Sequence, residues 1–176
     1  MEKPSFSLAV VMQRRPSASR WQAEFWEPLS VLAGYQGAGE PRLLVEDGGM
    51  QQWLHPGFKL ELHRDEAEGY YLNVSAPNPR VFVFWRLEGG EADGQEGQGG
   101  EADGKGGGGA RGVPLQVTVS FNEAGRWLDG GHSVDGVAMP PEVFAWTGEY
   151  VEQNYRPEPK KRIKPRSFMH PKDRVG

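Results

Sequence analysis

Alternation of apolar and polar side chains between residues 58 and 87 is the feature that most constrains how this chain can fold. The segment Phe58–His63 alternates with period two, as in a strand that buries one face. Tyr70–Val74 and Val81–Leu87 are rich in aromatic and β-branched residues, and the polar segments Asp65–Gly69 and Ala76–Pro79 separate these runs. We therefore expect three strands joined by turns in an antiparallel meander.

The residues before this meander predict further strands. Leu8–Arg15 is an apolar run that predicts the first strand. The alternation in Trp21–Val31 changes phase near Pro28, which is typical of a β-bulge or an edge strand. Residues 42–54 predict a short hairpin that turns at Asp47-Gly48-Gly49, and His55-Pro56-Gly57 predicts the turn into the meander.

Residues 89–112 differ completely in composition from the rest of the chain. Twelve of these 24 residues are glycine, and Gly-Gly-Glu-Ala-Asp-Gly occurs at 89–94 and again at 99–104. Without large apolar side chains, nothing offsets the entropy cost of ordering the segment, which predicts a flexible insert. Leu87 and Leu115 flank it in strand-like runs, so we interpret it as an expanded hairpin loop; a linker between two domains is the alternative.

Two helices are predicted near the C-terminus. Ser120-Phe121-Asn122-Glu123 matches a capping box, and Pro140-Pro141-Glu142 is typical of the first turn of a second helix. We expect the two helices to cover one face or end of the sheet, with Trp127 and Trp146 buried beneath them.

Together these elements predict an α+β fold. We expect a curved antiparallel sheet or partly open barrel of about seven or eight strands, with two C-terminal helices. Residues 4–155 are predicted to form a single domain that contains the flexible insert 89–112, and residues 156–176 a disordered basic tail.

Composition excludes several kinds of site. The chain has no cysteine, so it has neither disulfides nor thiolate metal sites. The apolar run Ser7–Met12 is shorter than the core of a secretion signal, and no apolar segment approaches the length of a membrane helix. We therefore expect a soluble, cytoplasmic protein with no membrane contact.

No catalytic constellation is visible in the sequence. His55, His63, His132 and His170 have no spacing typical of a zinc site. The carboxylates Glu61, Asp65, Glu66 and Glu68 lie in and beside a predicted turn, where solvation explains them. Ser75 and Ser120 lack a glycine-flanked elbow. The glycines match neither a phosphate-binding loop nor a dinucleotide-binding motif. We expect no enzyme activity, no bound metal and no cofactor.

The basic tail is the clearest polar feature. The net charge of −4 combines an acidic body with residues 156–176, which hold eight Lys/Arg residues and two acidic residues. Its predicted partner-binding residues are Lys160, Lys161, Arg162, Lys164 and Arg166. Three interpretations remain open: binding to a polyanion such as nucleic acid, docking onto an acidic protein, and a solubilising segment without a partner. Because neither predicted helix is basic, sequence-specific DNA binding is disfavoured.

Nine segments of the chain resemble an uncharacterised proteobacterial domain family. These segments are Pro4–Pro16, Ser19–Trp21, Trp26–Pro28, Leu54–Phe58, Asp65–Ser75, Arg80–Val83, Val119–Ala124, Trp127–Gly131 and Tyr155–Lys161. The resemblance covers nearly the whole chain except the glycine-rich insert, which departs from the family pattern.

Members of that family are typically encoded beside molybdenum-dependent formate dehydrogenases and their maturation chaperones. The resemblance therefore implies an accessory role in the maturation or assembly of such an enzyme, with a formate dehydrogenase subunit or maturation factor as partner. Some relatives are labelled as molybdopterin-guanine dinucleotide biosynthesis proteins, but this chain lacks the glycine-rich, lysine-containing nucleotide loop of such a transferase. The family offers no functional residues to carry over.

Overall fold

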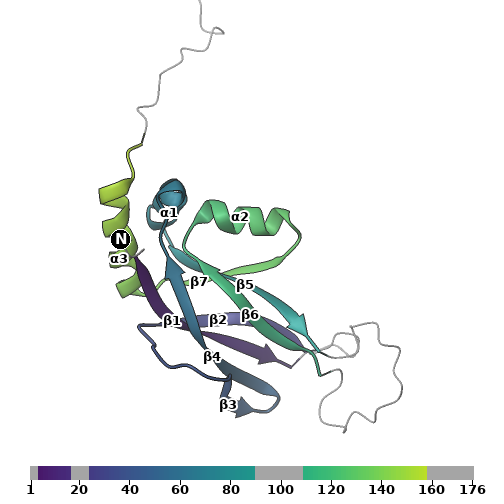
Figure 1. Cartoon of the computed structure of the whole chain (residues 1–176). Helices are drawn as coiled ribbons and strands as arrows, with labels where there is room; N and C mark the ends of the chain where they lie inside the picture. Colours follow the sequence, from purple (N-terminus) through teal and green to yellow (C-terminus); the bar gives the residue numbers. More distant parts are fainter. Residues whose placement is uncertain (1–3, 17–23, 90–108, 158–176) are drawn as a thin grey trace, which may run out of the picture.

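The described part of the chain forms two antiparallel sheets with a group of helices at one end (Figure 1). The computed structural model describes residues 4–16, 24–89 and 109–157. In chain order the elements are β1 (Ser5–Arg15), β2 (Phe25–Ala33), β3 (Arg42–Asp47), β4 (Met50–Glu61), the 3-10 helix η1 (Arg64–Glu66), α1 (Ala67–Val74), β5 (Arg80–Glu88), β6 (Arg111–Thr118), α2 (Phe121–Asp129), β7 (Ser133–Ala138) and α3 (Pro141–Asn154).

One sheet has the strand order β2-β1-β4-β3 and the other β6-β5-β7, and every pair is antiparallel. Alternate residues of β1 point to opposite faces of the first sheet. Leu8, Val10 and Met12 belong to the main core between the sheets, whereas Ala9 and Val11 join a smaller cluster on the outer face. Strand β1 is therefore buried on both sides.

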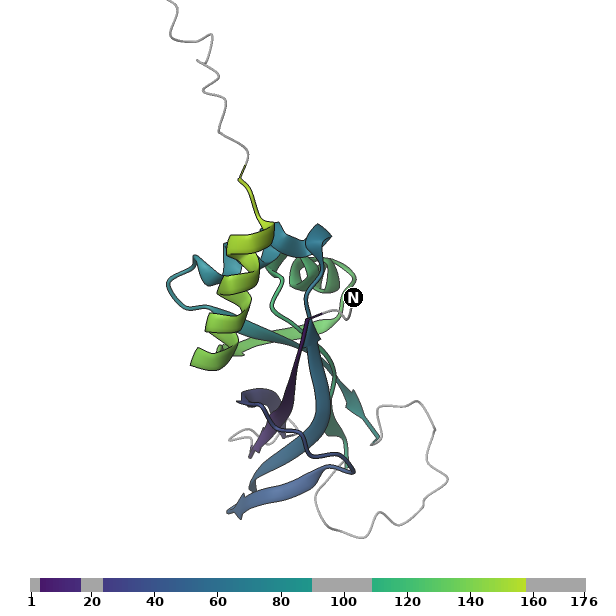
Figure 2. The same cartoon turned by 60° about the vertical axis from the view of Figure 1, so that its left-hand side comes forward.

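The helices gather at one end of the two sheets, where β4 ends and β5 begins (Figure 2). The second and third helices begin as the sequence predicts. The Ser120 hydroxyl accepts a hydrogen bond from the Glu123 backbone N–H at 3.0 Å, and Pro141 is the first residue of α3. Trp127 and Trp146 are only partly buried; Trp127 contacts Phe84 and Trp146 contacts Phe6, with ring centroids 5.5 Å and 5.4 Å apart. The prediction that both would be buried beneath the helices is therefore not confirmed.

The predicted α+β class and antiparallel pairing are confirmed. The described residues form seven strands, which divide into two sheets rather than one, and they form no closed barrel. Strand β7 was not predicted, because Ser133–Ala138 is short and mostly exposed. The prediction for Pro28 is confirmed: it lies on the edge strand β2, where the pairing with β1 shifts register.

The predicted turn at His55-Pro56-Gly57 was wrong, because β4 continues through it. The register passes from Val10 opposite His55 to Leu8 opposite Phe58, so the first sheet absorbs the extra residue as a bulge. Gly57 has a φ of 89°, a conformation that glycine adopts without a steric penalty. A Pro-Gly pair here bends a strand instead of ending it.

The predicted strand at Tyr70–Val74 was also wrong. Residues 64–74 form η1 and α1, so β4 and β5 are not neighbours in a meander but belong to different sheets. Ala67, Tyr70 and Asn73 are buried and recur at a spacing of three residues, which is a helical period. The aromatic and β-branched composition of the segment masked this period.

Strands β5 and β6 flank the glycine-rich insert and pair with each other, with Leu87 opposite Gly112. This pairing agrees with an insert placed inside a hairpin. Most of the insert and nearly all of the tail lie outside the described residues, so the assignment of 4–155 as one domain stays a prediction.

Candidate binding pocket

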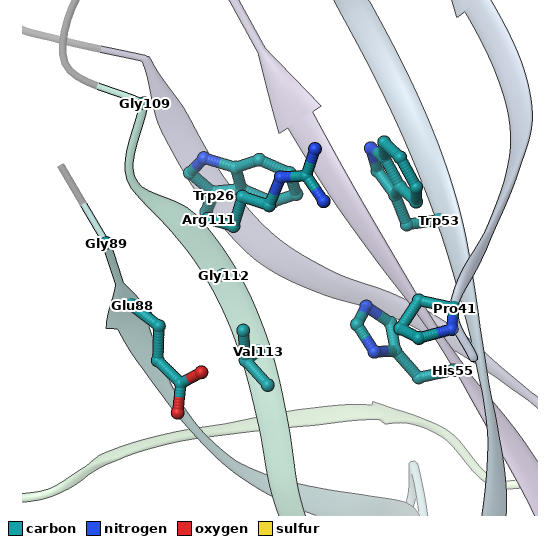
Figure 3. A pocket seen from close by; sticks show the side chains of 10 residues that line it. All are labelled: Trp26, Pro41, Trp53, His55, Glu88, Gly89, Gly109, Arg111, Gly112 and Val113. Atoms are coloured by element: carbon teal, nitrogen blue, oxygen red, sulfur yellow. The ribbon is translucent and has the colours of Figure 1, made fainter. Parts of the chain in front are cut away.

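A pocket of about 400 Å³ opens between the two sheets, near the end of the β5–β6 hairpin (Figure 3). Four strands and the segment before β3 contribute to its wall. Its lining residues are Trp26, Pro41, Trp53, His55, Glu88, Gly89, Gly109, Arg111, Gly112 and Val113. This size and a largely apolar wall with a few polar groups are typical of small-molecule or side-chain binding sites.

The register of β4 places two of these side chains in the pocket. Trp53 pairs with Met12 and His55 pairs with Val10, and both partners lie on the core face of β1. Residues directly opposite each other in a sheet share a face, so Trp53 and His55 also point toward the second sheet. Leu54, between them, joins the outer cluster instead.

Gly112 lets the two sheets approach closely behind the pocket. A Cβ atom at this position would lie 2.9 Å from the Trp26 Cβ and 3.1 Å from the Met12 Cε. The absence of a side chain therefore brings β6 against Trp26, which is 5% exposed. The indole is also fixed by a hydrogen bond from its Nε1 to the Ala110 carbonyl oxygen at 3.1 Å.

Arg111 supplies the positive charge of the pocket. Its guanidinium lies over the Trp53 ring, 4.7 Å from the ring centroid, in a cation–π contact. The side chain extends between Trp26 and Trp53, and the Glu88 carboxylate points away from it (Figure 3). Glu88 instead pairs with Arg86 at 2.6 Å. Within the described residues, no carboxylate lies at ion-pair distance from Arg111.

His55 is a neutral polar group in the same pocket. Burial, and secondly the positive charge of Arg111, lower the pKa of His55 from 6.5 to about 4. At neutral pH the imidazole therefore carries no charge and offers one N–H donor and one nitrogen acceptor. Apart from the Glu88 carboxylate, which is paired with Arg86, the pocket combines two indole rings, one cation and one neutral imidazole, a set that suits recognition of an anion beside an apolar group.

His63, His132 and Ser120 lie outside the pocket. His63 is near Glu61, at 3.8 Å, on the partly exposed segment after β4. His132 packs on Phe84 with ring centroids 4.6 Å apart. Ser120 is a helix cap and donates a hydrogen bond to Glu66 at 2.5 Å.

Among the described residues, the remaining polar residues singled out in the sequence add no group to the pocket. Ser75, Asp65 and Glu68 are exposed. Within the described part of the chain, no three His, Asp or Glu residues are grouped closely enough to hold a metal ion. His170 and the tail residues Lys160, Lys161, Arg162, Lys164 and Arg166 lie outside the described residues.

Sequence reasoning missed this pocket. Trp53 and His55 are two residues apart on one strand, a spacing that places them on one face and was the available signal. Arg111 gave no signal, because it lies among glycines at the end of the insert. Its proximity to Trp53 depends on β6 packing against β4, which is a contact between the two sheets.

Comparison with known proteins identifies the family. Residues 7–164 match the family described as "Protein of unknown function (DUF3305)", which is most of the chain, so the protein belongs to that family. Comparisons with curated proteins and with solved structures gave no match. None of the helices in the described residues has the length and apolar character needed to span a membrane.

Proposed function

We propose that this protein is a non-catalytic accessory protein that supports the maturation or assembly of a molybdenum-dependent formate dehydrogenase through protein–protein contacts. The resemblance of its nine segments to proteins encoded beside such enzymes supports the class of partner. The observation that carries the proposal is the pocket around Arg111, whose side chains suit recognition.

The charge of Arg111 defines the chemistry of the partner segment. A guanidinium stacked on an indole keeps its in-plane N–H groups free to donate to a carboxylate. No described carboxylate is close enough to use them. The walls formed by Trp26 and Trp53 favour an apolar or aromatic side chain beside that carboxylate. The proposed ligand is therefore an acidic residue next to an apolar one, on a subunit or maturation factor of the enzyme.

Affinity purification from cells that express the formate dehydrogenase operon tests this proposal. The tagged wild-type protein should recover a subunit or maturation factor. Arg111→Gln should lower that recovery at least tenfold, since a charged hydrogen-bonded contact in an interface contributes about 2 kcal/mol or more. Arg156→Gln is the matched control, because this exposed arginine is outside the pocket and, among the described residues, donates to the Glu152 carbonyl oxygen alone.

Two outcomes would contradict the proposal. Recovery of no formate dehydrogenase component by the wild-type protein would remove the partner class. Equal recovery by wild type and by Arg111→Gln would remove the pocket as the contact site. Circular dichroism and thermal unfolding of both variants would exclude loss of folding as the cause of a lower recovery.

The charge asymmetry of the chain supports a second candidate function, binding of a polyanion such as nucleic acid through Lys160, Lys161, Arg162, Lys164 and Arg166. Counterion release would make such binding steeply dependent on salt. Truncation after Pro157 should abolish the binding, whereas Arg111→Gln should leave it unchanged. Absence of nucleic-acid binding by the full chain at low salt would refute this function.

A further inference from the structure

His55 lies beside the cation–π pair of the pocket. Trp53 and His55 are separated by one residue on β4, so their side chains leave the same face of the strand roughly 7 Å apart. The Arg111 guanidinium lies 4.7 Å from the Trp53 ring centroid, and it shares the pocket with the imidazole of His55 (Figure 3). A carboxylate that binds Arg111 inside this pocket is therefore a near neighbour of the imidazole.

The ring nitrogens of His55 are open to such a ligand. Two causes lower the pKa of His55 to about 4, burial first and the charge of Arg111 second, and no hydrogen bond within the described residues is among them. A half-buried imidazole without a partner keeps one N–H donor and one acceptor to offer. The N–H group can donate to the same carboxylate as the guanidinium.

Few charged groups face His55 within the described residues. Arg111 comes from β6 and Glu88 from β5, and the Glu88 carboxylate is already paired on its own strand. Arg42 of β3 lies on the other face of the first sheet, since its partner on β4 is Leu54. The remaining neighbours are uncharged: Val10, opposite His55 on β1, and the wall residues Trp26, Pro41, Trp53 and Val113.

A bound carboxylate reverses the electrostatic balance at His55. Its negative charge offsets that of Arg111, and it accepts a stronger hydrogen bond from an imidazolium than from a neutral ring. An opposite charge within about 4–6 Å shifts a pKa by about 1–3 units. A rise of about two units would bring the pKa of His55 from about 4 in the free protein to about 6 in the complex.

We propose that His55 is a second carboxylate-binding group of this pocket and that it takes up a proton from solvent when the acidic ligand binds. The inference rests on the proposed function, which gives the pocket an acidic residue beside an apolar one as its ligand. A group whose pKa is higher in the complex than in the free protein gains a proton on binding. The affinity therefore rises as the pH falls through the window between the two pKa values.

Binding of the blocked dipeptide N-acetyl-aspartyl-phenylalaninamide tests the proposal, because this probe carries one carboxylate next to one aromatic ring. If the pKa rises by about two units, the dissociation constant should be about fourfold lower near pH 5.5 than near pH 7.5. The asparagine analogue of the dipeptide, which has no carboxylate, should show no such gain.

Two histidine variants identify the group that takes up the proton. His55→Gln keeps a side-chain N–H donor that does not titrate, so its dissociation constants at the two pH values should be nearly equal. His63→Gln is the matched control, because His63 lies outside the pocket near Glu61 and its loss should leave the fourfold change intact. Circular dichroism at both pH values should show that all three proteins are folded.

NMR of the His55 imidazole, assigned by its loss in His55→Gln, reports the proton directly. In the free protein the Cε1–H chemical shift should change little above about pH 5, whereas with the dipeptide bound it should titrate near about pH 6. A pKa of His55 that the bound dipeptide does not raise would contradict the proposal.

The binding data offer further ways to overturn it. Equal wild-type affinity at the two pH values would do so, as would an unchanged pH dependence in His55→Gln or no dipeptide binding by the folded wild type at millimolar concentration. Arg111-dependent recovery of a formate dehydrogenase component together with pH-independent dipeptide binding would refute this inference and leave the proposed function standing. Proton-linked binding without recovery of such a component would refute the partner class alone.

Discussion

Replacing Asn73 by alanine should destabilise the fold strongly, because this side chain joins three parts of the chain. Asn73 lies on α1 and is 2% exposed. Its Nδ2 donates to the Arg80 carbonyl oxygen at 2.7 Å and to the Val119 carbonyl oxygen at 2.9 Å. Its Oδ1 accepts from the Arg80 backbone N–H at 2.9 Å. The amide thereby links α1 to the start of β5 and to the segment between β6 and α2.

The size of the effect follows from these three bonds. Each hydrogen bond contributes about 1 kcal/mol net, which gives about 3 kcal/mol for Asn73→Ala. The removal also leaves a buried carbonyl at Val119, which is 1% exposed, without its amide partner. The desolvation of that group raises the expected loss toward about 5 kcal/mol. Such a loss is a large share of the about 5–15 kcal/mol that stabilises a typical domain.

Urea unfolding followed by tryptophan fluorescence measures this change. The free energy of unfolding in water should fall by about 3–5 kcal/mol in Asn73→Ala. Asn78→Ala, an exposed asparagine in the segment before β5, is the matched control and should change it by less than about 0.5 kcal/mol. A loss below about 1 kcal/mol in Asn73→Ala would mean that water or rearranged backbone replaces these bonds, and the reasoning would be refuted.

Three further predictions concern single side chains. Because the pKa of His55 falls from 6.5 to about 4 on folding, the unfolded chain binds the extra proton between these values. The contribution of neutral His55 to the free energy of unfolding is therefore complete above pH 6.5 and is lost as the pH falls toward 4. The free energy of unfolding of His55→Gln should depend less on pH in this window than that of the wild type. Thr147 is fully buried and its hydroxyl has no partner among the described residues. Thr147→Val should therefore raise the free energy of unfolding by about 1 kcal/mol, which a higher urea midpoint would show. Gly69→Ala should lower the thermal unfolding midpoint although alanine favours helices, because the new Cβ would lie 2.2 Å from the Ser120 Oγ. A higher midpoint in Gly69→Ala would contradict this prediction and would mean that the Ser120 side chain moves away without cost.

Local signals explain which elements could be predicted from the sequence. The start of α2 depends on Ser120 and Glu123, and that of α3 on Pro141, so each signal lies within one turn of the helix. The edge position of Pro28 follows from its missing backbone donor. In each of these cases the physical cause and the structure it produces are neighbours in the sequence.

Distant partners explain why α1 was predicted as a strand. The side chain of Asn73 is satisfied by Val119, 46 residues away. Gly69 faces Ser120, 51 positions further along the chain. A segment with mixed local propensity takes the conformation that satisfies such contacts, and none of them is visible within residues 67–74. The pocket was missed for the same reason, since Arg111 and Trp53 meet only across the two sheets.

Asn73 and Ser120 at the helical end differ from Arg111 at the open end in burial and in hydrogen bonding, and this difference separates their effects on stability and on binding. At the helical end, Asn73 and Ser120 are buried and have hydrogen-bond partners within the chain. At the open end, Arg111 is exposed and has no described carboxylate beside it. Buried polar groups cost free energy when their partners are removed, whereas exposed ones cost little. Substitutions at the helical end should therefore act on folding, and Arg111→Gln should change recognition in a protein that remains folded.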